Sequence, residues 1–206
     1  MKYLLTSIGT RGDIEPFIAL AVLLKKQGHQ VKVACPEQYL YLLDGLGMKS
    51  FGLDRRFVEL IESEEGRQVM GGKINFFKRV TLLISLYKKS LSINRNLMLQ
   101  QAQLTKEFNP DQLIFSSKAL YGVIHHAKNG GRAIWLTPIP CMIHVNEDFA
   151  NIGFKVNLGK FLNKMTYALA NAAIVKSIKQ SSKQNNLLQG LNGINLKRKL
   201  KEIPMI

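Results

Sequence analysis

Residues 1–24 read MKYLLTSIGTRGDIEPFIALAVLL and combine the signals of a buried strand, a glycine-rich turn and an amphipathic helix. The apolar run Tyr3–Ile8 predicts the strand, and leucines spaced for one helix face predict the helix. Between them lies the turn Gly9–Asp13, followed by Pro16 at a place that a first helical turn tolerates. A strand, loop and helix in this order are typical of a parallel α/β sheet.

The same alternation of strand and helix signals continues along the chain. Apolar spacing and glycine or proline boundaries predict strands at 31–35, 48–53, 113–115 and 133–136, and helices at 36–43, about 118–129 and from about 158 onward. Residues from about 56 to 106 show helical spacing without a convincing strand, which predicts an insertion of two or more helices. We therefore expect a single domain, residues 1–206, with a Rossmann-like parallel sheet, flanking helices and this helical insertion.

Composition narrows the class of protein. The chain has 206 residues and a formal net charge of +15, which favours contact with anionic surfaces such as phospholipid head groups, nucleic acid or phosphorylated ligands. Its two cysteines, Cys35 and Cys141, suggest neither a disulfide framework nor a zinc cluster, and we expect a cytoplasmic protein. No stretch approaches the roughly 18 to 20 apolar residues that span a bilayer, so any membrane contact is expected to be peripheral.

The turn after the first strand is the sharpest local motif. Its sequence, Gly-Thr-Arg-Gly-Asp, matches neither the three-glycine dinucleotide fingerprint nor a Walker A loop. It nevertheless lies at the carboxyl edge of the predicted sheet, where open α/β folds bind ligands. From the local sequence alone, Asp13 is expected to cap the first helix, because a carboxylate near a helix start accepts hydrogen bonds from free backbone N–H groups. This role can coexist with a chemical one.

Several segments resemble glycosyltransferase family 28 and the related sterol and antibiotic glucosyltransferases. The opening Ser7–Phe17 carries the strongest likeness, and Gly28–Val31, Asn109–Asp111 and Thr137–Pro140 match in order and spacing. The resemblance implies a GT-B fold, in which two Rossmann-like domains face each other across a cleft. It implies that the acceptor binds the N-terminal domain and that a UDP-sugar is held mainly by the C-terminal one. The donor motif of that second domain has no counterpart here.

By this resemblance the chain is the N-terminal, acceptor-binding half of a GT-B enzyme. The expected reaction is an inverting hexosyl transfer from a UDP-sugar, a co-substrate and not a cofactor, to a lipid or other hydrophobic alcohol. The chain alone is expected to be inactive, with a donor domain supplied in cis or in trans. The alternative is a non-catalytic acceptor-binding or membrane-recruiting subunit of a split glycosyltransferase.

The resemblance also implies site residues. Asp13 corresponds to the general base, and Arg11 orients Asp13 or meets donor phosphate. His144 lies where the family forms part of its acceptor pocket, although the surrounding sequence departs from the family pattern. No histidine sits in a metal-ligand pattern, so no metal is expected. The candidate substrate-binding residues are Gly9, Thr10, Arg11, Gly12, Pro138, Pro140 and His144.

Basic residues are concentrated in two regions without acidic ones. Eight lysines and arginines fall between Gly66 and Lys106, interleaved with aromatic and aliphatic residues, and ten more fall between Ala150 and Lys201. The first region is typical of an interfacial amphipathic segment, so we expect contact with an anionic membrane. A helix packed on the sheet with solvated lysines is the simpler alternative. Nucleic-acid binding is not expected, because no reader motif is present. The candidate membrane-contact residues are Lys73, Phe76, Phe77, Lys78, Arg79, Lys88 and Lys89.

Overall fold

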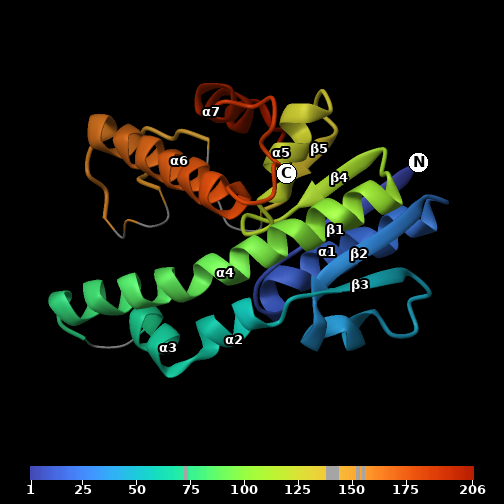
Figure 1. The fold of residues 1–206 in the computed structure, drawn as a ribbon, viewed down its shortest axis with the longest axis horizontal. Helices are drawn as coiled ribbons and strands as arrows, with labels where there is room; N and C mark the ends of the chain where they lie inside the picture. The colour runs from blue at the N-terminus through green and yellow to red at the C-terminus, as the bar shows by residue number, and fades with distance from the viewer. Residues whose placement is uncertain (72–73, 138–143, 152–153, 155) are drawn as a thin grey trace.

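A computed structural model describes residues 1–71, 74–137, 144–151, 154 and 156–206 (Figure 1). Its centre is a parallel sheet of β1 (Lys2–Thr6), β2 (Gln30–Pro36), β3 (Lys49–Leu53), β4 (Gln112–Phe115) and β5 (Ala133–Trp135), in the order β3-β2-β1-β4-β5. All the predicted strands are therefore confirmed. The chain order reverses between β1 and β4, and the carboxyl ends of these two neighbours form the switch point at which such sheets bind ligands.

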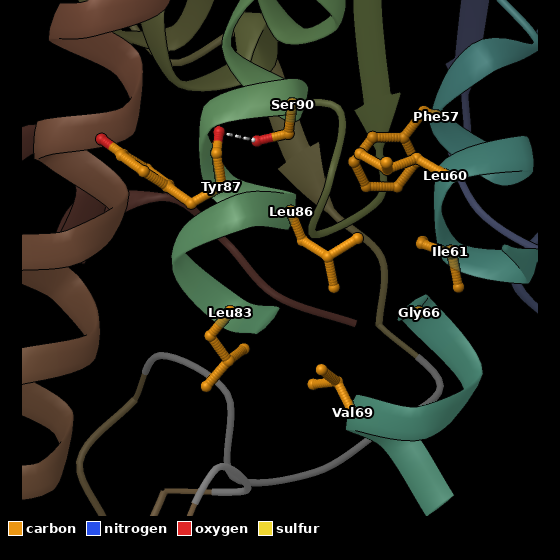
Figure 2. A pocket seen from close by; sticks show the side chains of 9 residues that line it. All are labelled: Phe57, Leu60, Ile61, Gly66, Val69, Leu83, Leu86, Tyr87 and Ser90. Carbon is orange, nitrogen blue, oxygen red and sulfur yellow. Dashed lines mark hydrogen bonds between the residues drawn. The ribbon is translucent and has the colours of Figure 1, made fainter. Parts of the chain in front are cut away.

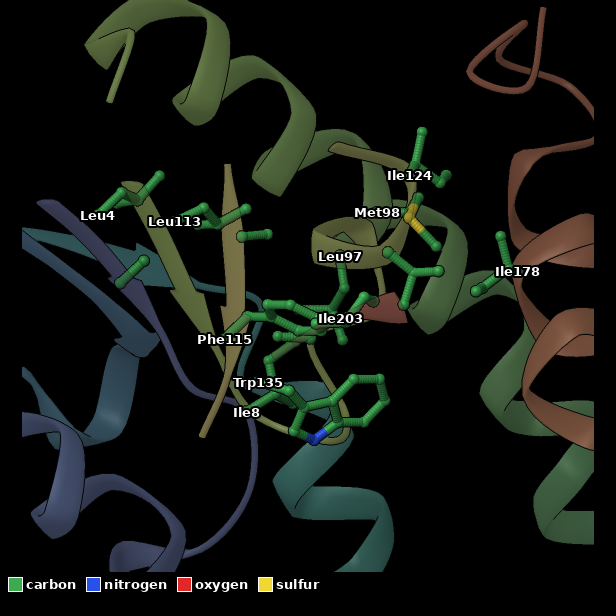
Figure 3. Packing of buried hydrophobic residues seen from close by; sticks show 14 of the residues in the cluster. Leu4, Ile8, Leu97, Met98, Leu113, Phe115, Ile124, Trp135, Ile178 and Ile203 are labelled. Atoms are coloured by element: carbon green, nitrogen blue, oxygen red, sulfur yellow. The ribbon is translucent and has the colours of Figure 1, made fainter. Parts of the chain in front are cut away.

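Strand periodicity divides the core into two clusters, one on each face of the sheet. In β1, Leu4 faces one cluster and Leu5 the other, as successive residues of a strand must. The larger cluster packs Phe115 against Trp135 with ring centroids 4.9 Å apart and adds Leu97 and other helix residues (Figure 3). This packing fixes the strands whose carboxyl ends form the switch point.

Helices cover both faces of the sheet. On the face of the smaller cluster lie α1 (Arg11–Lys26) and the 3₁₀ helix η1 (Glu37–Leu43). The other helices are α2 (Arg56–Glu62), α3 (Glu64–Gly71), α4 (Phe76–Phe108), α5 (Tyr121–Lys128), α6 (Lys160–Ser182) and α7 (Gly193–Glu202). The larger cluster takes buried residues from α4, α5, α6 and α7, and the partly buried Phe57 and Leu60 of α2 pack against it.

Three helical predictions need correction. The second helix, predicted at 36–43, is a 3₁₀ helix over Glu37–Leu43. The segment between Pro36 and the turn at Gly45, which has φ +74°, is short, and 3₁₀ geometry is typical of such short connecting segments. The first helix begins at Arg11 and places Pro16 inside it, where the proline ring cannot donate the usual backbone hydrogen bond. The helix predicted from about residue 118 begins at Tyr121, after a tight turn at its start.

The predicted helical insertion is confirmed as α2, α3 and α4. With 33 residues, α4 is about 50 Å long, longer than the sheet beneath it. Its second half packs in the core through residues such as Leu97 and Leu104, whereas its first half extends beyond the carboxyl edge of the sheet (Figure 1). A hydrogen bond from the Tyr87 hydroxyl to the Gln180 side chain joins α4 to α6 at this edge.

The last residues of the chain return to the sheet. The Trp135 amide donates to the Pro204 carbonyl at 2.8 Å, and the Ile206 amide donates to the Trp135 carbonyl at 2.9 Å. The segment after α7 thus pairs in parallel beside β5. Over the described residues, none of the helices combines the length and apolar character needed to cross a bilayer.

Candidate active site

The turn between β1 and α1 is built around Gly9 and Asp13. Gly9 has φ +143°, a conformation that favours glycine. A Cβ at this position would lie 2.1 Å from Asp13 Oδ2, so a side chain there would displace the carboxylate. The tight turn lets Asp13 fold back on Thr10, the residue that precedes α1.

Asp13 stabilises the start of α1. Its Oδ2 accepts hydrogen bonds from the Thr10 amide at 2.8 Å and from the Thr10 hydroxyl at 3.2 Å. The Asp13 amide donates to the Thr10 carbonyl at 2.9 Å. Asp13 is the third residue of the helix and has the geometry of the acidic member of a capping box, so the capping role expected of it is present.

A lysine completes the surroundings of Asp13. Lys118 Nζ lies 2.9 Å from Asp13 Oδ2, and the two side chains are 34% and 21% exposed. All three hydrogen bonds thus converge on Oδ2, while Oδ1 accepts none from the described residues. Among the described contacts, the protein thus holds the carboxylate by one oxygen.

Two serines tie the carboxyl ends of β1 and β4 together. Ser116 Oγ accepts from the Ile8 amide at 3.1 Å, and the Ser7 hydroxyl donates to the Asp13 carbonyl at 2.8 Å. Ser7 and Ser116 are both buried. These bonds fix the loop that carries Asp13 relative to the loop that carries Lys118, so the pair sits in a rigid frame at the switch point.

Arg11 forms an ion pair with Glu15 one helical turn later, at 2.6 Å, and is not among the described side-chain partners of Asp13. The hydrogen bond and charge of Glu15 raise the pKa of Arg11 further above its usual value, so it stays a cation. Nearby, burial and the charge of Glu62 raise the pKa of Tyr39, while a hydrogen bond from the Arg11 backbone opposes the shift. Tyr39 therefore lies between the site loop and the end of α2.

An apolar pocket of about 270 Å³ opens between α2, α3 and α4. Figure 2 shows Ile61 of α2, Val69 of α3 and Leu83 and Leu86 of α4 around a common space. Because α2 follows the carboxyl end of β3, the pocket lies at the same edge of the sheet as Asp13. Its full lining is Phe57, Leu60, Ile61, Gly66, Val69, Leu83, Leu86, Tyr87 and Ser90.

The other predicted substrate-binding residues are less closely gathered. Thr10 and Gly12 belong to the turn and first residues of α1, whereas Pro138 and Pro140 fall outside the described residues. His144 is exposed, and it makes no hydrogen bond to Asp13 in the described contacts. The candidate residues of the Gly9–Asp13 turn therefore lie together, whereas the described hydrogen bonds do not connect His144 with this turn.

The predicted membrane-contact residues lie at the start of α4, apart from Lys73, which falls outside the described residues. Phe76 begins the helix, and its side chain is not described. Phe77 is 81% exposed, and Lys78 and Lys88 are also exposed, whereas Arg79 is half-buried. Lys89 is exposed too, but it pairs with Glu65 of α3 at 2.8 Å.

The histidines are not grouped with other metal-ligating side chains among the described residues. Burial lowers the pKa of His125 to about 4, which keeps this side chain neutral inside the domain. Its Nδ1 lies 3.0 Å from the Asn129 side-chain amide one turn later on the same helix. In the part of the chain that the structure describes, no three His, Cys, Asp or Glu residues gather closely enough to bind a metal ion.

Sequence reasoning did not single out Lys118, Ser116 or the apolar pocket. Lys118 and Ser116 come directly after β4, the strand that neighbours β1 in a Rossmann-like order. Polar residues at the carboxyl ends of adjacent strands were therefore a usable signal. The pocket had no such signal, because its lining depends on how α2 and α3 fold back onto α4.

Comparison with known proteins identifies the domain. The profile of the glycosyltransferase family 28 N-terminal domain matches residues 3–134, more than half of the chain. The chain belongs to this family. The matched residues thus include β1 from Tyr3 onward, β2 to β4, the first two residues of β5, the Asp13–Lys118 pair and the apolar pocket.

Curated relatives match the family 28 domain over short stretches. An uncharacterised glycosyltransferase of Mycobacterium leprae (strain TN) is 40% identical over 48 residues, which are 23% of this chain and 11% of that protein. The UDP-sugar-dependent glycosyltransferase 52 of Dictyostelium discoideum is 44% identical over 54 residues, 26% of this chain and 3% of that protein. O-mycaminosyltylonolide 6-deoxyallosyltransferase of Streptomyces fradiae is 37% identical over 49 residues, 24% of this chain and 12% of that protein.

Solved structures share the fold at low sequence identity. The calicheamicin glycosyltransferase CalG4 superposes with a TM-score of 0.56 and 13% identity, over 98% of this chain and 46% of that one. The glycosyltransferase VinC, solved in complex with DTDP, gives 0.53 and 11%, over 89% of this chain and 44% of that one. The family 28 chain thus spans less than half of either enzyme. The predicted fold, one half of GT-B, is confirmed.

Proposed function

We propose that the chain is the acceptor-binding half of an inverting hexosyltransferase that moves a sugar from a UDP-sugar to a lipid or other hydrophobic alcohol. The observation that carries the proposal is the Asp13 carboxylate at the switch point, which is held through Oδ2 and accepts no hydrogen bond on Oδ1 from the residues that the structure describes. A fixed carboxylate with one free oxygen suits a general base. Family membership supports sugar transfer as the reaction.

The proposed step balances as a single displacement. The acceptor oxygen attacks the anomeric carbon of the donor sugar while its proton passes to Asp13 Oδ1. The bond between that carbon and the UDP phosphate oxygen breaks, and UDP leaves with the electron pair. Attack from the face opposite UDP inverts the anomeric centre. A donor-binding domain, in cis or in trans, supplies the UDP-sugar, and no cofactor is required.

The apolar pocket supports a hydrophobic acceptor. Its wall is almost entirely aliphatic and aromatic, with Ser90 beside it, whereas the Tyr87 hydroxyl points away from the pocket toward Gln180 of α6. Burial of apolar surface contributes roughly 25 cal/mol per Å², so a pocket of this size favours a hydrocarbon body over a polar sugar. The acceptor hydroxyl would then project toward the carboxyl edge of the sheet.

Binding of a fluorescent sterol to the purified chain tests this assignment. We expect saturable binding that weakens at least about tenfold in Leu83→Asp, because a carboxylate at the pocket wall must be desolvated by the ligand. Leu99→Asp is the matched control, since Leu99 is similarly exposed on the same helix and does not line the pocket. Equal loss in both variants, or none in Leu83→Asp, would contradict the assignment.

The alternative, a non-catalytic subunit, is favoured by one observation. Asp13 Oδ2 accepts three hydrogen bonds from two residues of the chain, Thr10 and Lys118, as a purely structural carboxylate would. The two functions differ in one measurable result. If the chain is a catalytic half, transfer by the chain combined with a donor-binding domain depends on the Asp13 carboxylate. If it is a recruiting subunit, transfer does not depend on it.

The exposed start of α4 supports peripheral membrane contact as part of the same proposal. Lys78 and Lys88 share this part of the helix with exposed apolar residues, among them Phe77 and Ile84. Cations beside apolar side chains are typical of interfacial helices. A membrane would supply the hydrophobic acceptor at the edge of the sheet where the pocket opens.

A further inference from the structure

The first half of α6 has an inverted distribution of polarity. Three polar residues, Asn163, Thr166 and Asn171, are at most 3% exposed. On the outside of the same helix, four apolar residues are about half or more exposed, namely Phe161 at 74%, Leu162 at 48%, Met165 at 46% and Leu169 at 61%. An ordinary surface helix has the opposite arrangement.

The buried polar residues have a structural role. The Asn163 side-chain amide donates to the Glu147 carbonyl at 2.8 Å, and its oxygen accepts from the Leu158 amide at 3.0 Å. Thr166 Oγ1 accepts from the Asn151 amide at 2.8 Å. These bonds fasten the segment before α6 to the inner face of the helix, which explains why that face is polar.

The exposed apolar residues have no such explanation within the described chain. Phe161, Met165 and Leu169 recur every four residues and form one stripe along the helix. Phe149 and Val156, in the segment fastened to α6, are each 62% exposed as well. Contiguous apolar surface of this kind marks a contact with a partner or a membrane.

Positive charge beside the apolar stripe favours an anionic membrane as its partner. Lys160 and Lys164 lie on the same half of α6 and are exposed, and no acidic residue occurs between Ala150 and Lys201. Lys164 also pairs with Glu147, at 2.5 Å. The chain has a formal net charge of +15. A bilayer with anionic head groups therefore complements both features of α6, because its apolar interior suits the stripe and its negative surface attracts the lysines.

We infer that the first half of α6 is a second membrane-docking element, which inserts Phe161, Met165 and Leu169 into an anionic lipid bilayer. The inference rests on the membrane contact of the proposed function and extends it from α4 to a separate helix. The two helices meet where Tyr87 bonds Gln180, and their first halves both extend to the left in Figure 1. A bilayer resting on both would border the edge at which the acceptor pocket opens.

Tryptophan fluorescence of the whole chain tests the insertion. The chain has one tryptophan, Trp135, which is 1% exposed and therefore gives a constant background. In Phe161→Trp, vesicles of phosphatidylglycerol should shift the new emission to the blue, and brominated acyl chains should quench it. Ile194→Trp, at an 81% exposed position on α7, is the control and should show neither effect. Unchanged emission at position 161 with vesicles present would overturn the inference.

Vesicle affinity provides a second test. Phe161→Ser with Leu169→Ser should weaken binding to phosphatidylglycerol vesicles about tenfold or more, because two side chains lose their burial in lipid. Ile194→Ser should leave binding unchanged. Full retention in the double variant, or a chain that self-associates through this stripe and ignores vesicles, would refute the inference. If only substitution of the α4 residues weakened vesicle binding, the inference about α6 would be refuted as well. That result would leave the proposed membrane contact of α4 and the proposed sugar transfer intact.

Discussion

At the scale of single residues, Asp13 combines a structural and a proposed chemical role on its two oxygens. Oδ2 caps α1 through Thr10 and pairs with Lys118, whereas Oδ1 accepts no hydrogen bond from the described residues. The division allows both interpretations of the sequence motif to hold together. It also means that substitutions can separate them, because an asparagine keeps the oxygen of a cap but not the basicity of a carboxylate.

Asp13→Asn should therefore leave the fold intact and lower transfer. With a donor-binding domain supplied, we expect turnover to fall by ~10² to 10⁴, the contribution typical of a general base. Asp13→Ala should in addition cost about 1 kcal/mol of unfolding free energy through loss of the cap. Turnover and urea unfolding of both variants are the measurements. Parental turnover in a folded Asn variant would show that Asp13 is not the base.

Gly9→Ala tests the geometry of the same turn. The added methyl would lie 2.1 Å from Asp13 Oδ2, and the φ of +143° is unfavourable for alanine. We expect a loss of about 1 to 3 kcal/mol in unfolding free energy and displacement of the carboxylate. Gly12→Ala is the matched control, because a Cβ there meets nothing within 4 Å. Similar stability of the two variants by urea unfolding would contradict this account of the turn.

At the scale of secondary structure, a charged network joins the end of β3 to α2 and α4. Asp54, 8% exposed, accepts from Arg56 Nε at 2.9 Å and from the Asn96 side chain at 2.7 Å. The Asp54 amide in turn donates to Gln100 at 2.9 Å. Hydrogen bonds from Arg56, then those from Asn96, outweigh burial and lower the pKa of Asp54 to about 2. The network holds the helices that form the apolar pocket.

This network predicts a pH dependence of stability. Because folding lowers the pKa of Asp54 from 3.8 to about 2, its contribution is fully present above about pH 4 and is lost as the pH falls through 2. The shift corresponds to about 2 kcal/mol. Asp54→Asn should lose about this amount at pH 6 and show a smaller difference from the parent at pH 2. Asp44→Asn, at an exposed residue, is the control in urea unfolding. An equal deficit at both pH values would contradict the assignment.

The elements differ in how far their sequence predicts them. Apart from the edge strand β3, the strands are largely buried, and glycine, proline or asparagine lies near their ends, so their apolar runs identify them without tertiary information. Helix starts are less predictable, because the Thr10–Asp13 contact moves the start of α1 ahead of Pro16. The sequence of α4 indicates a helix but not where it leaves the core, since apolar residues continue from Leu97 back to Phe77.

At the scale of the whole molecule, contacts between distant segments define the candidate site. Asp13 and Lys118 are far apart in sequence, and the adjacency of β1 and β4 brings them together. The motif at residues 9–13 is recognisable alone, because a tight turn needs its glycines. The partner lysine and the pocket depend on strand order and helix packing, which local patterns do not encode.

Charge is also distributed unevenly over the molecule, and this predicts a salt-dependent membrane interaction. Helix α4 places Lys78, Arg79, Lys88 and Lys89 in its first four turns, beyond the carboxyl edge of the sheet. Basic residues near an anionic surface contribute about 1 kcal/mol each, and salt screens them. Replacing all four with Gln should weaken binding to phosphatidylglycerol vesicles on the order of tenfold or more at low salt. The difference should shrink as the salt concentration rises.

A matched control separates location from net charge in this experiment. The exposed residues Lys26, Lys49, Lys106 and Lys128 lie at or near the ends of α1, α4 and α5 and the start of β3, all at the opposite edge of the sheet. Their replacement with Gln removes the same charge from the chain. If α4 faces the membrane, this second variant binds vesicles almost as the parent does, because charges more than a Debye length from the lipid contribute little. Equal weakening of the two variants in vesicle co-sedimentation would mean that net charge alone drives the interaction, and the orientation proposed for α4 would be wrong.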